Sequence, residues 1–402
     1  MNRDPAFEDW VGEARRADVL RVAMALPGGS HLGPGHCTNV PCPGCGGIKR
    51  FSVNTRKNIF YCRETAVGGD AIALVRHATG GDFLDAVELI TGRPMPGKKA
   101  LTEQEKKERA ERLAALDASR QAHQARAEAE HNEFRDREIR RARKIWDAAQ
   151  PMAGSAAEAY LEKRGVAWAP NARLRSLAAL PYWHRIGADW RIIHEGPALV
   201  AAIAGPPEGG FIGCHCTWID LAQAKGKAAI AHPETGELLA AKKVRGSHRG
   251  GHIRLGGEGR CARLFVGEGI ETVYAVREAL VAAGQSLADT WFWSSVNMGN
   301  LGGKAANRSR HPVLTHTDAR GRVRPVFVPG PLPLLDDTRS LAPPEEAVDI
   351  VLLGDGDSDR LTTENVLKRF AARHGRAGRI IRAAWADDGK DFGDMWQGER
   401  AA

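Results

Sequence analysis

The sequence predicts a multidomain α/β protein, and three observations carry this prediction. The 402 residues are enough for two or three domains. The composition changes sharply along the chain, from a stretch rich in Gly, Pro, His and Cys to a highly charged stretch. Beyond these, strand and helix patterns alternate, which is typical of a parallel sheet covered by helices. We expect domain boundaries that divide the chain into residues 1–95, 96–150, 151–258 and 259–402.

Composition and charge narrow the classes of protein. No run approaches the roughly 18 apolar residues that span a bilayer, and residues 1–10 include three acids and no apolar signal core. We therefore expect a cytoplasmic protein that does not associate with membranes. In that compartment, seven cysteines indicate metal ligands or buried thiols instead of disulfides. The net charge of +8 favours a polyanionic partner such as nucleic acid, although many basic proteins bind none.

The first segment combines helices with a small β-hairpin. Apolar positions at helical spacing predict a helix over residues 6–26. After the Gly- and Cys-rich stretch, alternating apolar residues predict two strands, residues 50–54 and 58–62, joined by a basic turn. Two helices, each opened by an acid, are expected to follow over residues 70–78 and 83–91.

Three cysteines in this segment have the spacing of metal ligands. Cys42 and Cys45 form a Cys-x2-Cys knuckle followed by two glycines, and small residues are needed where backbone N–H groups turn toward thiolate sulfur. Cys62 ends the second predicted strand. A β-hairpin that carries further ligands back to the knuckle is the arrangement of a zinc ribbon, so we expect structural Zn²⁺ here. The alternative is that these are ordinary buried cysteines in a ribbon without metal.

The fourth zinc ligand is not evident from the spacing. A tetrahedral structural site needs four ligands. A second knuckle that starts at Cys62 would place the fourth ligand at Thr65, which does not ligate zinc. Two residues just upstream of the first knuckle are the candidates, and we expect Cys37, or else His36, to complete the site.

The second segment is highly charged and almost free of aromatic residues before Phe134 and Trp146. Thr102 followed by Glu105 is a capping box, the signature of a helix N-terminus. We therefore predict a long helical linker over residues 96–150. Its charges are expected to keep its faces solvated and not to contact nucleic acid.

The third segment is expected to form a mixed α+β lobe. A short helix over residues 156–164 precedes two strands, residues 198–204 and 211–219, around a Pro- and Gly-rich turn. A glycine-rich basic run follows, and such a run can bind phosphate groups, although basic loops are most often simply solvated. The cations of this run are Lys242, Lys243, Arg245 and Arg249.

The last segment carries acids at the ends of predicted strands. One apolar strand ends at Glu268, which stands between two glycines, and a second ends at Asp355 and Asp357. In open α/β sheets, ligands bind at the carboxyl ends of the strands. Because side chains alternate along extended backbone, Asp355 and Asp357 point the same way and can share a divalent cation. A third acidic group, Asp391 and Asp394, follows another predicted strand.

The order of features between residues 35 and 92 is specific. The knuckle and its glycines are followed by Arg50-Phe51-Ser52-Val53, Phe60-Tyr61-Cys62, Gly68-Gly69-Asp70-Ala71-Ile72 and Phe83-Leu84-Asp85-Ala86-Val87. This order resembles the N-terminal zinc ribbon of bacterial and phage primases, which reads single-stranded template DNA. The resemblance implies that basic residues hold phosphates while Phe51 and Tyr61 stack on bases, although both rings could equally form the core of the hairpin. The basic residues are Lys49, Arg50, Arg56 and Lys57.

The acids of the last segment also follow a known order. Glu268-Gly269, then Asp355-x-Asp357, then Lys390-Asp391-x-x-Asp394 resemble the motifs of the Toprim fold, which primases share with topoisomerases and some nucleases. The match covers roughly residues 260–398. The resemblance implies a C-terminal Toprim α/β domain with a parallel sheet, and a catalytic Mg²⁺ or Mn²⁺. The implied ligands of this ion are Glu268, Asp355, Asp357 and Asp359.

Three departures from the family pattern are evident. Arg360 stands near the place where a glycine often follows the acidic pair. Thr217 stands where an arginine is usual soon after the first strand of the basic lobe. The insertion over residues 301–345 is unusually long, and we expect a hairpin within it from His311 to Val328.

The whole chain most resembles the primases and primase-like proteins of plasmids, phages and integrated mobile elements. The resemblance implies nucleotidyl transfer from nucleoside triphosphates on single-stranded DNA, with Glu268, Asp355 and Asp357 as catalytic residues. Glu268 would ligate metal or accept the proton of the primer 3′-hydroxyl. The basic run from Lys242 to Arg249 would bind template or triphosphate. No Gly-x4-Gly-Lys-Ser/Thr loop occurs, so a replicative helicase would be a separate partner.

Two other interpretations stay open. One is a Toprim nuclease or a topoisomerase-type enzyme, but the latter needs a nucleophilic tyrosine, and no tyrosine has a context that favours this role. These are Tyr61, Tyr160, Tyr182 and Tyr274. The other is a catalytically inactive adaptor that binds single-stranded DNA, for which Thr65 and Thr217 are the best support. The presence of Glu268, Asp355 and Asp357 argues against it.

Overall fold

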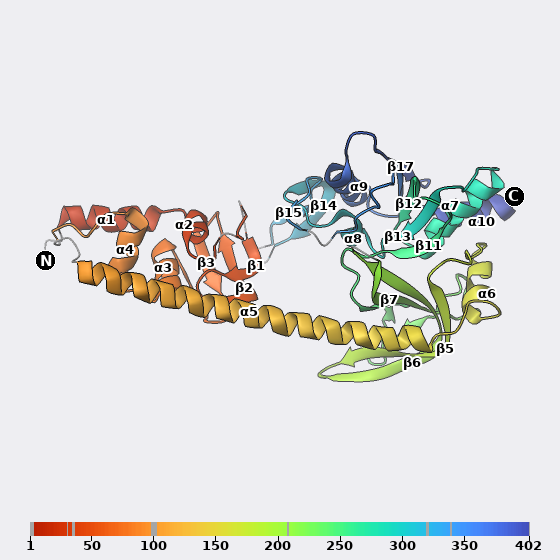
Figure 1. Cartoon of the computed structure of the whole chain (residues 1–402), viewed down its shortest axis with the longest axis horizontal. Helices are drawn as coiled ribbons and strands as arrows, with labels where there is room; N and C mark the ends of the chain where they lie inside the picture. The colour runs from red at the N-terminus through yellow and green to blue at the C-terminus, as the bar shows by residue number, and fades with distance from the viewer. Residues whose placement is uncertain are drawn as a thin grey trace. The chain divides into compact units, whose positions relative to one another are not determined.

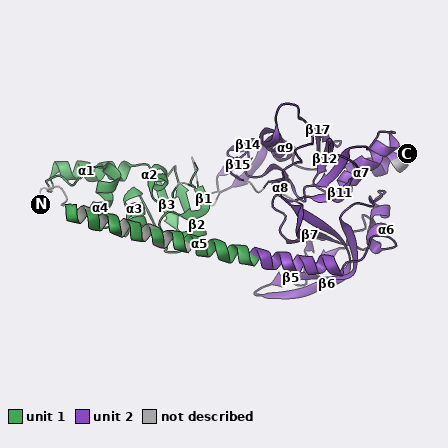
Figure 2. Ribbon diagram, in the orientation of Figure 1, with its two compact units in different colours: residues 1–134 green, residues 135–402 purple. Residues whose placement is uncertain are grey.

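The computed structural model describes most of the chain. It covers residues 4–29, 31–33, 37–97, 103–206, 209–318, 321–337 and 340–401. The chain forms two compact units, residues 1–134 and residues 135–402 (Figure 2). In the described stretches, no helix is both long enough and apolar enough to cross a membrane.

The first unit packs short helices against a small antiparallel sheet of strand order β1-β2-β3-β4 (Figure 1). The predicted strands correspond to β2 and β3, and the two predicted acid-capped helices to α3 and α4. In each of these helices an aspartate, Asp70 or Asp82, accepts a hydrogen bond from the backbone of the first turn. The elements are α1 (Pro5–Arg16), α2 (Val19–Ala25), β1 (Cys37–Cys42), β2 (Gly46–Asn54), β3 (Ile59–Cys62), β4 (Val67–Gly69), α3 (Ala71–Thr79) and α4 (Phe83–Thr91).

The single helix expected over residues 6–26 is divided into α1 and α2. Asp18 interrupts it, because its backbone is extended and its carboxylate caps the second helix by accepting the N–H of Arg21 at 2.9 Å. Asn58, in the turn between β2 and β3, then accepts the N–H of Val19 at 2.9 Å through its side chain. A side-chain cap inside the apolar pattern therefore ends one helix and begins the next.

A long helix, α5 (Glu103–Ala148), occupies the segment predicted as a linker. Most of its described side chains are exposed, as the charge pattern predicts, whereas Ala142 near its C-terminus is fully buried. The division between the two units falls within this helix. Thr102 of the predicted capping box lies outside the described residues.

The first sheet of the second unit is antiparallel, with strand order β10-β7-β6-β5. The predicted strands lie within β6 and β7, but β6 begins much earlier and forms with β5 a long hairpin that the sequence analysis missed. Trp218 is fully buried in the core against this sheet. The elements are α6 (Ala156–Lys163), β5 (Leu174–Ile186), β6 (Asp189–Gly205), β7 (Gly210–Trp218), β8 (Ile230–Ala231), β9 (Leu238–Leu239) and β10 (Lys242–Gly246).

The second sheet of this unit has the order β11-β13-β12-β16-β17. β12 is parallel to β13 and to β16, and β16 is parallel to β17, so the predicted parallel sheet is present. Only β11, at the edge, runs antiparallel to its neighbour among the described strands. The elements are β11 (Ile253–Gly257), β12 (Arg263–Gly267), α7 (Ile270–Ala282), β13 (Thr290–Ser294), α8 (Met298–Gly302), β16 (Asp349–Gly354), α9 (Arg360–His374), β17 (Ile380–Trp385) and α10 (Phe392–Ala401).

The long insertion between β13 and β16 forms a two-stranded antiparallel hairpin, β14 (Arg308–Thr317) and β15 (Val323–Pro329) (Figure 1). It contains the hairpin that was predicted between His311 and Val328, with strands that begin and end slightly outside those bounds. The hairpin is not hydrogen-bonded into the parallel sheet.

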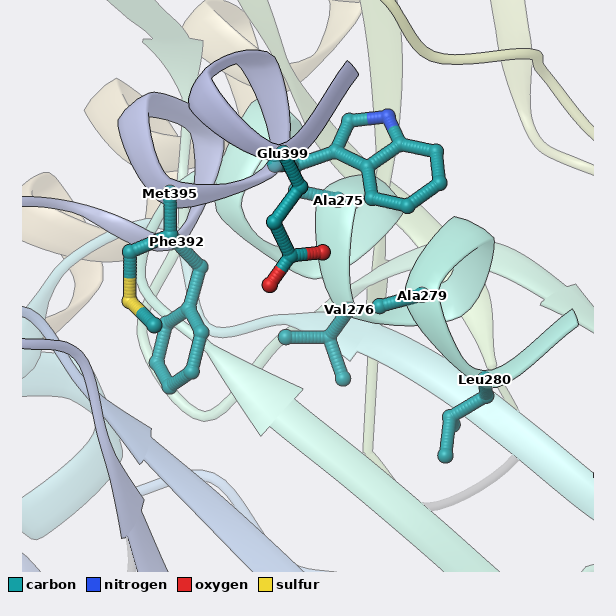
Figure 3. Close-up of a pocket in the computed structure, with 8 residues that line it drawn as sticks. Ala275, Val276, Ala279, Leu280, Phe392, Met395 and Glu399 are labelled. Carbon is teal, nitrogen blue, oxygen red and sulfur yellow. The ribbon is translucent and has the colours of Figure 1, made fainter. Parts of the chain in front are cut away.

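An apolar cavity of about 260 Å³ lies between α7 and α10 (Figure 3). Its lining contains one ionisable side chain, Glu399, and none of the acids at the strand ends. The lining residues are Ala275, Val276, Ala279, Leu280, Phe392, Met395, Trp396 and Glu399. A mostly apolar lining with a single carboxylate offers little to orient a polyanionic substrate, so the candidate chemistry lies elsewhere.

Candidate metal centres and nucleic-acid interface

A cluster of three cysteines and one histidine forms in the first unit. Cys42 ends β1, Cys45 follows in the turn, Cys62 ends β3, and His77 projects from α3. Their ligand atoms all lie within 4.8 Å of one another. The turn is tight, because a Cβ on Gly44 would lie 2.9 Å from the Cα of Ala78 in α3. Three thiols and one imidazole are a donor set that suits tetrahedral zinc, so this cluster could bind Zn²⁺.

Contacts within the cluster favour the thiolate form of one of its cysteines, Cys45. The Sγ of Cys42 lies 3.2 Å from the Nε2 of His77, and the Sγ of Cys45 lies 3.5 Å from that of Cys62. The hydrogen bond from Cys42 lowers the pKa of Cys45 to about 4, with further help from His77 and Cys62. The same hydrogen bond, together with burial, raises the pKa of Cys42. A thiolate is the form in which cysteine ligates a metal.

The fourth member of the cluster corrects the expectation of Cys37. That thiol is half-buried, donates a weak hydrogen bond to the carbonyl of Gly33 at 3.5 Å, and does not belong to the cluster. His36 lies outside the described residues. His77 was missed because it lies on a helix well beyond Cys62, and only the packing of α3 on the hairpin brings it back. The ring of His77 stacks on Phe60 at 6.0 Å between centroids.

The two aromatic rings proposed to stack on bases have different environments. Phe51 is fully buried and stacks on Phe60 at 5.7 Å, so it belongs to the core. Tyr61 is 47% exposed, on the opposite face of the sheet from Phe60. Lys49, Arg56 and Lys57 are exposed as well.

Arg50 differs from the other basic residues of this hairpin, because its guanidinium lies 3.5 Å from the carboxylate of Glu64. An exposed ring with nearby cations suits a single strand of nucleic acid. On this hairpin only Tyr61 offers such a ring, since Phe51 is in the core.

The acids of the second unit gather where β12 and β16 end. These strands are parallel neighbours, with Val266 opposite Leu352, so Glu268 and Asp355 follow at the same edge of the sheet. Asp391, at the start of α10, is brought to the same place by two backbone hydrogen bonds that join its loop to Gly356. Gly356 is required there, because a Cβ would lie 2.0 Å from the carbonyl oxygen of Asp387. Glu268, Asp355 and Asp391 therefore follow at one edge of the parallel sheet.

Asp355 is the electrostatic centre of this group. Burial, together with the charges of Asp391, Asp357 and Glu268, raises its pKa to about 7 against the opposing hydrogen bond of Thr272. Its Oδ1 is buried and has no hydrogen-bond partner among the described residues. A carboxylate that neighbouring acids and burial both destabilise is a place where a divalent cation would be favourable.

Glu268 shares this environment. Burial raises its pKa, and the charge of Asp357 adds to that effect while Lys242 opposes it. Within the described residues, however, the carboxylate oxygens of these acids are not gathered as closely as the ligand atoms of the cysteine cluster are. Their oxygen donors nonetheless fit Mg²⁺ or Mn²⁺, which prefer carboxylates and retain water ligands.

Asp359 and Asp394 have other partners. Asp359 caps α9 by accepting the N–H of Thr362 at 2.8 Å, and its second oxygen lies 2.8 Å from the Nε2 of His311. These two hydrogen bonds lower its pKa to about 2. Asp394 pairs with Lys225 at 3.0 Å. Both oxygens of Asp359 therefore have partners in the helix and the hairpin, unlike Oδ1 of Asp355 among the described residues.

A buried polar network beside the acids was not predicted. The carboxylate of Glu271, on the first turn of α7, lies 3.2 Å from Lys227 and 3.0 Å from Lys242, and it accepts a hydrogen bond from the hydroxyl of Tyr160. Arg164 is 3% exposed, and its Nε and Nη1 have no partner among the described residues. The only sequence signal for this network was the spacing of Glu271 from Glu268, which places it on the following helix.

The basic run divides between two faces of β10. Lys242 reaches Glu271 and influences Glu268, so it lies beside the acids. Lys243 points the other way, donates to the carbonyl of Trp183 at 2.6 Å and lies 3.5 Å above the ring of Tyr182. Burial and, to a smaller extent, the nearby charge of Arg245 lower the pKa of Lys243 to about 8. Arg249 is exposed beyond the strand.

Comparisons with known proteins give one matching family model, over part of the chain, and several similar solved structures. Residues 136–255 match the family described as "Domain of unknown function (DUF7146)". No curated protein gives a significant match. The chain is similar to the zinc-binding and RNA polymerase domains of the Aquifex aeolicus primase, with 14% identity and a TM-score of 0.30 over 98% of this chain and 84% of that one.

Two further solved structures are similar over a smaller part of the chain. The DnaG catalytic core has 15% identity and a TM-score of 0.33, covering 67% of this chain and 74% of that one. The DnaG primase catalytic domain bound to single-stranded DNA has 15% identity and a TM-score of 0.34, covering 67% and 79%. At these identities and TM-scores, chemistry has to be inferred from the side chains of this chain itself.

Proposed function

We propose that the protein is a DNA primase of the phage and plasmid type, which makes short primers on single-stranded DNA by metal-dependent nucleotidyl transfer. The observation that carries the proposal is the environment of Asp355 among the other acids at the ends of β12 and β16. Its Oδ1 has no hydrogen-bond partner in the described part of the chain, and its pKa is raised. Lys242 lies beside these acids. Carboxylates for a divalent cation next to an ammonium group suit a nucleoside triphosphate. In this proposal residues 259–402 are a Toprim domain and residues 151–258 its basic lobe.

The acids have distinct roles in this proposal. Glu268, Asp355 and Asp357 would hold Mg²⁺ or Mn²⁺, which when bound neutralises and orients the triphosphate. Asp391 is a further candidate ligand, because its charge raises the pKa of Asp355. Glu268 is also a candidate to accept the proton of the primer 3′-hydroxyl, since burial raises its pKa above the ordinary value and makes it a stronger base.

The cations would bind the triphosphate. Lys242 is held beside the acids by its ion pair with Glu271, so its ammonium is positioned before substrate arrives. Arg164 is a second candidate, because two of its buried guanidinium nitrogens have no partner among the described residues. Guanidinium groups without internal partners are suited to phosphate oxygens.

The first unit would capture the template. Zinc bound by Cys42, Cys45, Cys62 and His77 would stabilise the small sheet, and exposed Tyr61 would stack on a base while neighbouring cations hold phosphates. In this proposal residues 1–95 are the zinc ribbon and residues 96–150 a helical linker. The protein would act in the cytoplasm, with any replicative helicase a separate partner.

Primer synthesis tests this function directly. Purified protein would be incubated with single-stranded DNA, four labelled nucleoside triphosphates and Mg²⁺ or Mn²⁺, beside an Asp355→Asn/Asp357→Asn variant. Asp388→Asn, an exposed acid nearby, is the matched control. We expect short products from the wild type and the control and none from the double variant. Intact strand binding without products would support the inactive adaptor instead, and degraded template the nuclease.

A further inference from the structure

The β14–β15 hairpin has no role in the proposed chemistry, yet its base is firmly fixed. Arg369 and Asn365 of α9 are each 3% exposed, and they donate hydrogen bonds to the carbonyls of Gly330 and Pro329 at 2.5 and 3.0 Å. His311 of β14 binds Asp359, two residues after Asp357. Buried polar side chains used in this way hold the hairpin in a defined place beside the acidic loop.

One face of the hairpin combines cations with an aromatic ring. Arg310 pairs across the strands with Phe327, and Arg308 pairs with Pro329. The side chains of both arginines therefore lie on the same face of the hairpin as the ring of Phe327. Phe327 is 43% exposed, and the guanidinium of Arg308 lies 5.7 Å from its ring centre. Both arginines are exposed.

We propose that this face, formed by Arg308, Arg310 and Phe327, binds single-stranded nucleic acid beside the acidic strand ends. The arginines would hold successive phosphates, and Phe327 would stack on an unpaired base. This inference rests on the proposed function, because it adds to it a track for the strand that enters or leaves the acidic site.

The charge of the hairpin favours nucleic acid over a protein partner. Residues 308–329 contain five arginines and a single acid, Asp318. The carboxylate of Asp318 lies 3.2 Å from the guanidinium of Arg324. Arg324 is opposite His316 in the strand register, and its side chain lies on the face of the hairpin opposite to that of Phe327. The proposed face therefore presents positive charge without a neutralising carboxylate among its members.

Strand binding by the full-length protein tests the inference. Fluorescence anisotropy of labelled oligo-dT would be measured over a series of salt concentrations, without nucleotides, for wild type, Arg308→Ala/Arg310→Ala and Phe327→Ala. Arg324→Ala is the control for position, because it removes one positive charge, half of what the double variant removes, from the opposite face. Circular dichroism would verify that each variant is folded, and Phe327→Trp would restore a stacking surface.

The three substitutions have different expected signatures. Loss of two phosphate contacts should reduce the slope of log affinity against log salt by about 1.4. Phe327→Ala should weaken binding roughly tenfold with little change in slope, and Phe327→Trp should restore it. Arg324→Ala should bind more tightly than the double variant and retain most of the wild-type slope. Equal losses from both faces, or no loss from either, would overturn the inference.

Duplex DNA and primer synthesis separate this inference from the proposed function. Phe327→Ala should leave duplex binding unchanged, and an equal loss on duplex and single strand would exclude stacking on an unpaired base. If the wild type makes no primers but the Arg308→Ala/Arg310→Ala variant still loses affinity for single-stranded DNA, the primase proposal is refuted and the binding face on the hairpin is kept. Normal primer synthesis and normal strand binding in that variant would refute the track alone.

Discussion

Replacing Glu271 with Gln should lower the free energy of unfolding of the second unit by about 3 to 5 kcal/mol, because it leaves two cations without their counter-charge. The residue is 6% exposed, with Lys227 at 3.2 Å and Lys242 at 3.0 Å from its carboxylate. Gln keeps the shape and can still accept a hydrogen bond from Tyr160, but it carries no charge. For a unit of roughly this size, the loss corresponds to a fall in Tm of roughly 6 to 20 °C.

The stability that Glu271→Gln loses relative to the wild type should depend on pH in a defined direction. Burial alone would raise the pKa of Glu271, but Lys242, Lys227 and the hydroxyl of Tyr160 together hold it well below 4.5. A carboxylate whose folded-state pKa is lowered contributes its full stability above the unfolded pKa and loses it as pH falls through the folded value. Wild type and variant should therefore differ most at neutral pH and converge in acid.

Urea unfolding followed by circular dichroism, at neutral and at acidic pH, measures both effects. Glu278→Gln is the matched control on the same helix, because Glu278 pairs with its neighbour Arg277 near the surface. This control should lose less than about 1 kcal/mol. The reasoning fails if both substitutions cost the same, or if the difference between wild type and Glu271→Gln does not change with pH.

Three further predictions concern the metal sites and the hairpin of the first unit. Metal analysis of purified His77→Ala should show lost zinc, whereas Cys37→Ala should keep it; the reverse result would return Cys37 to the ligand set. Because the pKa of Asp355 is raised to about 7, the metal-free wild type should lose stability relative to Asp355→Asn as pH rises from about 4 to about 7. Thermal melts of wild type and Asp355→Asn in the presence of a chelator would measure this loss. Added Mg²⁺ should narrow the difference in Tm between the two proteins. A wild type that gains stability relative to the variant as pH rises would contradict the prediction. Tyr61→Ala should weaken single-strand binding roughly tenfold at unchanged stability, whereas Phe51→Ala should cost about 3 to 5 kcal/mol of stability; equal effects on stability would show that Tyr61 is structural.

Local sequence patterns were enough to predict the elements that carry the acids and the three cysteines of the metal cluster, Cys42, Cys45 and Cys62. An apolar strand followed by an acid is visible in the sequence around Glu268 and around Asp355, because strand burial and loop polarity are short-range properties. The Cys-x2-Cys knuckle is visible for the same reason, since its geometry depends on residues next to one another. The parallel character of the sheet followed from the alternation of strands and helices, whereas the pairing of β12 with β16 did not.

Tertiary packing alone decided which distant side chains meet these elements. His77 replaces Cys37 in the cysteine cluster because α3 folds back on the hairpin, a contact with no local signature. Asp359 has the spacing of a ligand in the sequence. In the fold, one of its oxygens accepts a hydrogen bond from the first turn of α9 and the other is hydrogen-bonded to His311 of the insertion. The ion pairs of Glu271 with Lys227 and Lys242 join elements far apart in the chain. Sequence periodicity reports which face of an element is buried, whereas the partner on that face depends on how the whole chain folds.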